Sequence, residues 1–412
     1  MEVDIVLTAV GILGVVVAAL SAKMRRLPIS EPLLGLVAGV LIGPQVFDVF
    51  RLPPITEAHS LLHEASRILL AVSVMAVALR YPFADVRRCW RPVTLLLLVA
   101  MPVMAMVSAA LGWLVLSIPL AAAVLLGAAI CPTDPVLASS VVTGEDAERD
   151  LPAHDRRLLS LESGANDGLA LPLVLAAIAV AGGLGAGAAL GESLWQVLGA
   201  VAVGAGMGSA GGLALKWGDR YGATASAPAL FFTLVLALGI LGVAGLVHTD
   251  GVLAVFVGGL AFNLVGTGRE RAAEVPIDEA INRFAVLPLF VILGATLPWA
   301  TWFELGWRAV VLALAILVLR RIPILLLLRR PLRLQTRDAL YLGWFGPVGV
   351  SALFYLTLEA ERMGVDETVL AAGCLVLVMS TIAFGLSGVL GRSLYVKAAE
   401  REAAAADRES AK

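Results

Sequence analysis

Long apolar blocks separated by short polar stretches run along almost the whole chain. Each block approaches the ~20 residues that a helix needs to cross a bilayer. We therefore expect thirteen membrane-spanning helices and an all-α, polytopic fold. The blocks lie at residues 4–22, 29–46, 64–80, 92–116, 119–142, 158–181, 193–216, 228–247, 249–267, 282–297, 306–328, 338–358 and 367–391.

Composition agrees with a membrane protein and excludes several other classes. Hydrophobic residues make up 59% of the 412 positions and charged residues 15%, against about 25% charged residues in soluble domains. A net charge of −2 gives no basic surface for nucleic acid. The three cysteines are scattered and indicate neither a disulfide framework nor a zinc site. With no phosphate-binding loop and no HExxH pair, we expect neither a cofactor nor an enzyme activity.

Basic residues predict how the chain is oriented. Of the 30 Lys and Arg residues, 24 fall in alternate loops and in the C-terminal tail. Cytoplasmic loops hold the excess of basic residues. We therefore expect the N-terminus outside and the C-terminus in the cytoplasm, in the cell (inner) membrane. The polar residues 396–412 are then a cytoplasmic tail, predicted to be a loose helix.

Charges inside the apolar blocks indicate where the chemistry lies, because an ionisable residue deep in a membrane is costly and usually functional. Glu162 and two adjacent arginines, Arg320 and Arg321, are such residues, and so are Asp134 and Asp167. At a rise of ~1.5 Å per residue, Asp134, Asp167 and Arg320 lie roughly 12–14 Å from the inner ends of their helices. A hydrocarbon core of about 30 Å puts all three near its middle.

Two of the blocks carry helix-breaking residues at this depth. The sequence CPTDP at Cys131–Pro135 predicts a break at Thr133–Asp134, because each proline removes a backbone donor and clashes with the preceding turn. GWFGPVG at Gly343–Gly349 predicts a second interruption, seven blocks later and in the opposite orientation. Interrupted helices at matching positions of inverted halves are typical of a transporter binding site.

The block between them supplies oxygen-rich side chains in the sequence ESGAND, Glu162–Asp167. Glu162 and Asn166 share one helical face, as do Ser163 and Asp167. Carboxylate, hydroxyl and amide oxygens suit hard cations. We expect one carboxylate to pair with Arg320 or Arg321, which leaves the other free to titrate.

Small residues in GAGMGSAGG, Gly204–Gly212, predict a close contact between two helices rather than a binding site.

The TDP of Thr133–Pro135 followed by the ESxxND of Glu162–Asp167 resembles the sodium/proton exchangers of the NhaP/NHE type, within the monovalent cation:proton antiporter superfamily. EPLLGLVAGVLIGP at Glu31–Pro44 is similar to the family's early glycine-rich pattern. The resemblance implies crossed, broken helices five and twelve within a transporter domain at 1–395. It also implies moving core helices at about 92–181 and 306–391, and a scaffold at about 4–80 and 193–297 that forms a homodimer.

The resemblance further implies the roles of individual residues. Asp167 would bind a cation or a proton alternately, and Ser163 and Thr133 would help to coordinate Na⁺. Asn166 and Asp134 would belong to the same cation and proton site. Glu162 would form a structural ion pair with Arg320, with Arg321 as the alternative.

Two positions depart from the family pattern. Phe345 stands where relatives often carry an arginine, just before the glycine of the second broken helix. Residues 68–79 supply no acid, although some relatives bind the ion with a glutamate there.

We therefore expect an antiporter that exchanges protons for monovalent cations, Na⁺ first, with Li⁺ or K⁺ open. Exchange is expected to be electroneutral, because Asn166 stands where electrogenic relatives have a second acid. The alternative is a Na⁺-coupled symporter of organic anions on a related fold, which needs a roomy polar cavity. A sensor or channel is the other rival, and a sensor would need a folded domain outside the membrane.

Overall fold

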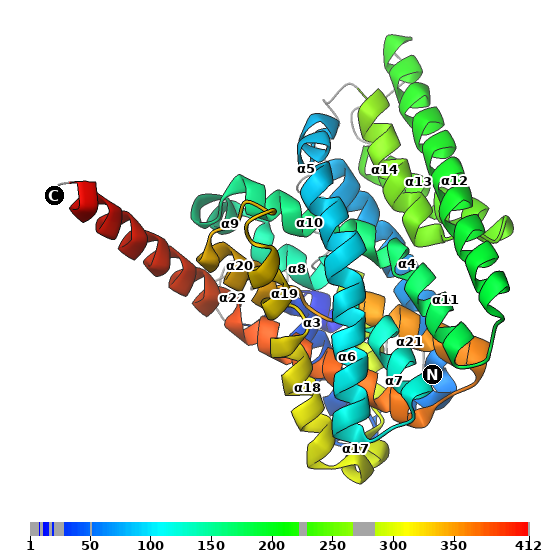
Figure 1. Ribbon diagram of the computed structural model, residues 1–412. Helices are drawn as coiled ribbons and strands as arrows, with labels where there is room; N and C mark the ends of the chain where they lie inside the picture. Colours follow the sequence, from blue (N-terminus) through cyan, green and yellow to red (C-terminus); the bar gives the residue numbers. More distant parts are fainter. Residues whose placement is uncertain are drawn as a thin grey trace.

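The computed structural model describes residues 29–49, 52–221, 229–266 and 285–410, together with a few helical positions between 8 and 19. Within these ranges every element is a helix and none is a strand (Figure 1). The all-α prediction is confirmed. The first predicted block, 4–22, lies mostly outside the described residues.

Helices occupy every predicted block from 29–46 onward. The helices of the first half are α3 (Glu31–Ile42), α4 (Ile55–Arg80), α5 (Phe83–Leu95), the π-helical turn η1 (Leu96–Ala100), α6 (Met101–Leu116), α7 (Leu120–Ala129), α8 (Pro135–Val142), α9 (Glu145–Asp150), α10 (Ala153–Leu169) and α11 (Leu171–Val180). Those of the second half are α12 (Ala186–Arg220), α13 (Ala229–Leu246), α14 (Gly251–Val265), α16 (Val286–Ala295), α17 (Trp299–Leu305), α18 (Trp307–Leu319), α19 (Ile322–Leu328), α20 (Thr336–Trp344), α21 (Val350–Met363) and α22 (Glu367–Ser410).

Length and hydropathy qualify six of the described helical stretches as membrane spans, or seven if the pair α16 and α17, bent by 64°, is one span. Some predicted spans fall short of this test because they are broken, and others, such as α3 with 12 residues and α14 with 15, because they are short. α7 has 10 residues and α8 has 8, and at ~1.5 Å per residue each covers roughly half of the hydrocarbon core. The count of thirteen spans stays a prediction.

Several helices extend beyond the predicted apolar blocks. α4 begins at Ile55 rather than near residue 64, and α12 runs for 35 residues from Ala186 to Arg220. α22 continues from the last span to Ser410, so the predicted loose tail helix is an extension of that span. Hydropathy marks only the part of a helix inside the hydrocarbon, whereas Ala, Glu and Arg favour helix in the polar region beyond it.

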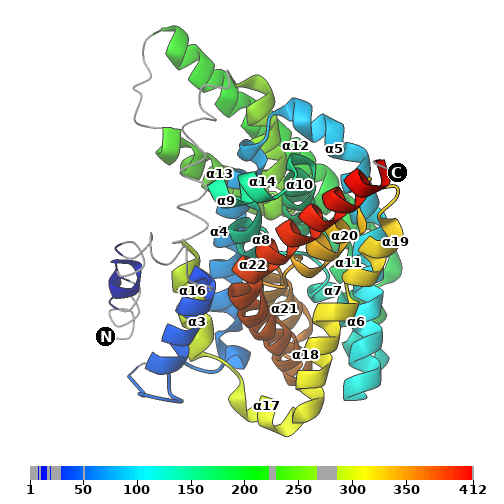
Figure 2. The same ribbon diagram turned by 90° about the vertical axis from the view of Figure 1, so that its left-hand side faces the viewer.

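The helices form two groups that α4 joins. On one side α12, α13 and α14 pack side by side, and α14 also packs on α4 (Figure 1). On the other side α6 packs against α7 and α18. α3 and α16 lie side by side in Figure 2. α4 contacts both α14 and α21 and therefore lies between the two groups.

Glycines explain the close approach of α12 and α14, as the small residues at 204–212 predicted. A Cβ on Gly204 would overlap the carbonyl of Ala254, and one on Gly208 would overlap the carbonyl of Gly258. Gly39 of α3 meets Val291 of α16 in the same way. In a membrane such backbone contacts supply the packing that the hydrophobic effect does not.

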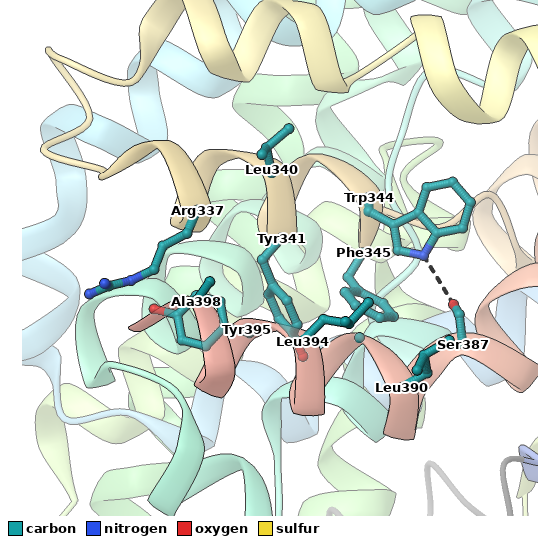
Figure 3. Close-up of a pocket in the computed structure, with 11 residues that line it drawn as sticks. Arg337, Leu340, Tyr341, Trp344, Phe345, Ser387, Leu390, Leu394, Tyr395 and Ala398 are labelled. Carbon is teal, nitrogen blue, oxygen red and sulfur yellow. Dashed lines mark hydrogen bonds between the residues drawn. The ribbon is translucent and has the colours of Figure 1, made fainter. Parts of the chain in front are cut away.

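α22 packs along α20, and the two helices enclose an aromatic cavity of about 440 Å³ (Figure 3). Phe345 fills the space above Gly391 of α22, where a Cβ would overlap its ring, and Tyr341 lies against Phe345. Trp344 Nε1 donates to Ser387 Oγ across 3.0 Å. Phe345, which departs from the family pattern, therefore joins the second broken helix to α22.

Helix contact through Gly208 gives the first prediction. Gly208→Ala should lower the stability of the protein by about 1–3 kcal/mol, as overpacking does, because its methyl group meets backbone that cannot rotate away. Gly206→Ala is the matched control, since nothing lies within 4 Å of a Cβ there. It should leave stability unchanged or raise it by about 0.5–1 kcal/mol. Thermal unfolding in detergent measures both, and equal melting temperatures would contradict the packing.

Candidate functional site

Two interrupted spans meet at their breaks. α7 ends at Ala129 and α8 begins at Pro135, while α20 ends at Trp344 and α21 begins at Val350. Both breaks fall where the prolines and glycines predicted them. The amide of Asp134 donates to the carbonyl of Pro347 across 3.0 Å, so the two unwound segments touch. Four half-helix ends are thereby gathered at one place inside the protein.

Asp134 binds the two N-terminal ends. Its Oδ1 accepts hydrogen bonds from the amides of Val136 at 2.6 Å and Leu137 at 3.0 Å, in the first turn of α8. Its Oδ2 accepts from the amide of Val350 and, at 3.3 Å, from that of Ser351, in the first turn of α21. A carboxylate satisfies free amides and the positive end of the helix dipole. One aspartate therefore caps both half-helices. The place of Asp134 in the cation and proton site stays a prediction.

Arg320 binds the two C-terminal ends of the half-helices. Its Nη1 donates to the carbonyls of Ile130 and, at 3.2 Å, of Pro132, just beyond α7. Its Nη2 donates to the carbonyl of Gly346 at 2.6 Å, just beyond α20. A guanidinium presents several donors in one plane and carries the positive charge that a helix C-terminus favours. The unwound carbonyls therefore have partners.

The partner of Glu162 is Arg321, and the first choice of the sequence analysis, Arg320, is wrong. Arg321 Nη1 and Nη2 donate to the two carboxylate oxygens of Glu162 at 2.9 and 2.8 Å, and both side chains are buried. Both arginines lie at the kink between α18 and α19. Consecutive residues project in different directions, so one arginine reaches the crossing and the other reaches α10.

Asn166 ties this ion pair to the first break. Its Nδ2 donates to Glu162 Oε1 at 2.9 Å and to Thr133 Oγ1 at 2.7 Å, while its Oδ1 accepts from the Thr133 amide at 3.4 Å. Thr133 Oγ1 lies 3.1 Å from Ser163 Oγ. The side chains predicted from TDP and ESxxND are therefore brought together. Asn166 has both its amide groups occupied and so positions Thr133 against α10.

Asp167 lies next to this network and differs from every other charge in it. The residue has no exposed surface, and within the described part of the chain neither carboxylate oxygen has a hydrogen-bond partner. Ser163 stands one turn earlier on the same helical face. Burying a carboxylate is costly unless something pairs with it. The geometry therefore leaves Asp167 ready to take a positive ion or a proton.

α21 contributes two residues that sequence reasoning missed. The buried hydroxyl of Ser351 has no regular hydrogen-bond partner and lies close enough to Asp167 to interact with its carboxylate. Tyr355, one turn later, donates its hydroxyl to the backbone carbonyl of Asp167 and, at 3.3 Å, to that of Gly168. In the sequence these two residues are marked only as polar side chains four positions apart, directly after the second break.

Breaking the buried ion pair gives a second prediction. Glu162→Gln leaves the guanidinium of Arg321 buried without its counter-charge, which should cost about 3–5 kcal/mol of stability. The double variant Glu162→Gln/Arg321→Gln should recover part of this loss. Thermal unfolding should show no such recovery in the matched control Glu162→Gln/Arg320→Gln. Recovery with Arg320→Gln instead would show that the pairing is the other one.

Comparison with known proteins identifies the family. A family model described as "Sodium/hydrogen exchanger, transmembrane" matches residues 12–390. The chain is 33% identical over 362 residues to "Na(+)/H(+) antiporter 2" of Zygosaccharomyces rouxii, covering 84% of this chain and 45% of that protein. It is 30% identical to a "Na(+)/H(+) antiporter" of Saccharomyces cerevisiae, covering 87% of this chain and 38% of that one. The chain thus spans less than half the length of these two relatives.

Solved structures show the same fold. The structure of the sodium proton antiporter MjNhaP1 from Methanocaldococcus jannaschii at pH 8 superposes with a TM-score of 0.73 at 19% sequence identity. The superposition covers 96% of this chain and 99% of that chain. At this level of identity the match concerns the fold. By the family model and the fold together, this multi-pass membrane protein belongs to the transmembrane sodium/hydrogen exchanger family.

Proposed function

We propose that the protein exchanges protons for monovalent cations by alternating access, with Na⁺ as the first candidate and Li⁺ or K⁺ as further ones. The observation that carries the proposal is Asp167, a fully buried carboxylate whose oxygens have no hydrogen-bond partner among the described residues. Relatives named Na(+)/H(+) antiporters support the same exchange. We place the ion at Asp167, with the hydroxyls of Ser163, Thr133 and Ser351 around it.

Charge balance at the crossing supports exchange of one proton for one cation. Asp134 and Arg320 offset the four helix ends, and Glu162 is paired with Arg321. These four formal charges sum to zero, so Asp167 is the one uncompensated charge among the described residues at the crossing. A proton neutralises the site, and so does one monovalent cation. The deprotonated, empty site keeps a buried negative charge and should not cross the membrane.

The rival symporter is not favoured. It would need a polar cavity that accepts an organic anion. The cavity at the end of α21 is lined by Glu359, Asp366 and Glu367, which repel an anion. The cavity between α20 and α22 is lined mainly by aromatic and aliphatic side chains, among them Tyr341, Phe345 and Leu394 (Figure 3).

We also propose the cell membrane as the site of action, with the N-terminus outside, the C-terminus in the cytoplasm and a homodimer as the working unit. The distribution of Lys and Arg supports the orientation. The close packing of α12, α13 and α14 on one another, at the upper right of Figure 1, supports a division into a scaffold and a moving core.

The decisive variant is Asp167→Asn. It removes the charge, keeps the shape and should fold, because a neutral amide is cheaper to bury than a carboxylate. Exchange in proteoliposomes should vanish at every pH. Asp250→Asn is the control: Asp250 is also buried but caps α14 by accepting from the amide of Leu253 at 2.9 Å, and asparagine caps as well. Near-normal exchange by Asp167→Asn would move the mechanism to another carboxylate.

Competition at one carboxylate predicts the pH dependence of the wild type. In the acidic range, where protons occupy the site, apparent cation affinity should weaken about tenfold per pH unit, because proton occupancy of the empty site follows proton activity. Initial rates at several Na⁺ concentrations and pH values measure this. Apparent affinity that stays constant while pH falls would show that proton and cation bind at separate places.

A membrane potential tests the stoichiometry. With one proton exchanged for one cation, imposing a potential with K⁺ and valinomycin should leave the exchange rate unchanged. Each net charge moved would couple transport to about 2.3 kcal/mol per 100 mV. A rate that rises severalfold with one sign of potential and falls with the other would contradict electroneutral exchange.

A further inference from the structure

Glu359, on α21, is a further buried carboxylate, away from the crossing. The residue is 4% exposed, and neither of its carboxylate oxygens has a hydrogen-bond partner in the part of the chain that the structure describes. Asp134 and Glu162, also buried, are by contrast bonded through both oxygens. An unpaired buried carboxylate is expensive in a membrane and usually has a function. The mechanism proposed above does not use Glu359.

Glu359 lines a cavity of about 600 Å³. The cavity lies where α7 begins, α11 ends and α21 gives way to α22, and its lining includes Pro119, Ala181 and Gly364. All of these loops fall on the side that the basic-residue distribution predicts to face outward. α21 and α7 are neighbours low in Figure 1, on the opposite side of the crossing from α9 and α10.

The cavity has one sign of charge. Among the described residues, the charged side chains that line it are Glu359, Asp366 and Glu367, and none is basic. Arg362, the nearest basic residue along α21, instead donates to Glu192 of α12 at 2.6 Å. Asp366 accepts from the amides of Thr368 and Val369 at 3.0 Å each, so it caps α22. Glu359 is therefore the buried acid of this cavity whose oxygens are open to a ligand.

α21 links this cavity to the exchange site. Ser351, Tyr355 and Glu359 are spaced by four residues and share one helical face. Ser351 lies near the Asp167 carboxylate, and Tyr355 bonds to the backbone of Asp167. Glu359 itself is close enough to Cys131, in the first break, to interact electrostatically with its thiol. At ~1.5 Å per residue, Glu359 and Ser351 are roughly 12 Å apart along α21.

We propose that Glu359 is a second monovalent-cation site, which receives the ion from the cavity at the loop end of α21 before the ion passes to Asp167. The inference rests on the proposed exchange at Asp167. Carboxylate oxygens suit such a hard cation. A cleft lined by a single sign of charge also concentrates counter-ions, by about 10- to 1,000-fold in binding rate. The Glu359 site would thus receive cations from one face of the membrane and not from the other.

Sided transport kinetics test the proposal. A cysteine introduced at Val365, which lines the cavity, identifies the face of the cavity through a membrane-impermeant maleimide. Right-side-out and inverted vesicles then give the KM for Na⁺ from each face. Glu359→Gln should raise the KM from the cavity face by about tenfold and leave the KM from the other face and the maximal rate unchanged. Glu359→Asp, which keeps the charge, should restore most of the affinity.

Glu361→Gln is the matched control. Glu361 is on the same helix, two residues further, but its carboxylate lies 3.8 Å from His63 Nε2 on α4. It should leave the KM from both faces as in the wild type. An unchanged KM from the cavity face in Glu359→Gln would show that Glu359 is a passive, protonated acid, and an equal effect from both faces would place it in the central machinery. Either result overturns the proposal.

Direct binding separates this inference from the proposal about Asp167. Thallium NMR reports a monovalent cation on the purified protein without any need for transport. Asp167→Asn should still bind Tl⁺, and Asp167→Asn/Glu359→Gln should not. No Tl⁺ binding by Asp167→Asn would overturn the Glu359 site while leaving the exchange at Asp167 intact. Full exchange by Asp167→Asn would instead refute the proposed function and not the second site.

Discussion

Two broken helices crossing inside a membrane create a problem that the rest of this structure depends on. The unwound segments expose amides and carbonyls where no lipid can bond to them, and each unsatisfied group costs several kcal/mol. Asp134 satisfies the two N-terminal ends and Arg320 the two C-terminal ends. Because one side chain serves two half-helices in each case, the crossing is held as a unit.

Compensation of the helix ends explains why the function can rest on one residue. The crossing needs two opposite charges for its own stability, and the ion pair of Glu162 with Arg321 adds two more that cancel. What remains is Asp167, held by α10 beside the network and unpaired. The site is neutral only when a proton or a cation occupies it, so its movement across the membrane is cheap in free energy only in the occupied state. This coupling follows from the cost of an uncompensated charge in a low-dielectric medium.

The sequence predicted the breaks well, because proline and glycine act through local backbone geometry. It also predicted which motifs meet, because charged side chains in an apolar block must face the protein interior and pair there. It could not choose between Arg320 and Arg321, because the choice depends on how the kink between α18 and α19 turns each side chain. An aspartate between two prolines is as typical of an ion ligand as of a helix cap, so the sequence could not predict that Asp134 caps both half-helices. Ser351 and Tyr355 carry no charge, so the sequence did not mark them as site residues. Their proximity to Asp167 depends on how α21 packs against α10.

The most direct test counts the protons displaced when a cation binds. Calorimetric titration of the purified protein with Na⁺, in buffers of different ionisation enthalpy, gives that number without transport. If Asp167 is the shared site of exchange, the number should approach one proton per Na⁺ at acidic pH and fall towards zero as the pH rises. Because Glu359 is proposed to bind a cation as well, the zero-release reference is Asp167→Asn/Glu359→Gln, which should release none. Two protons per cation in the wild type, or undiminished proton release by that double variant, would contradict the account.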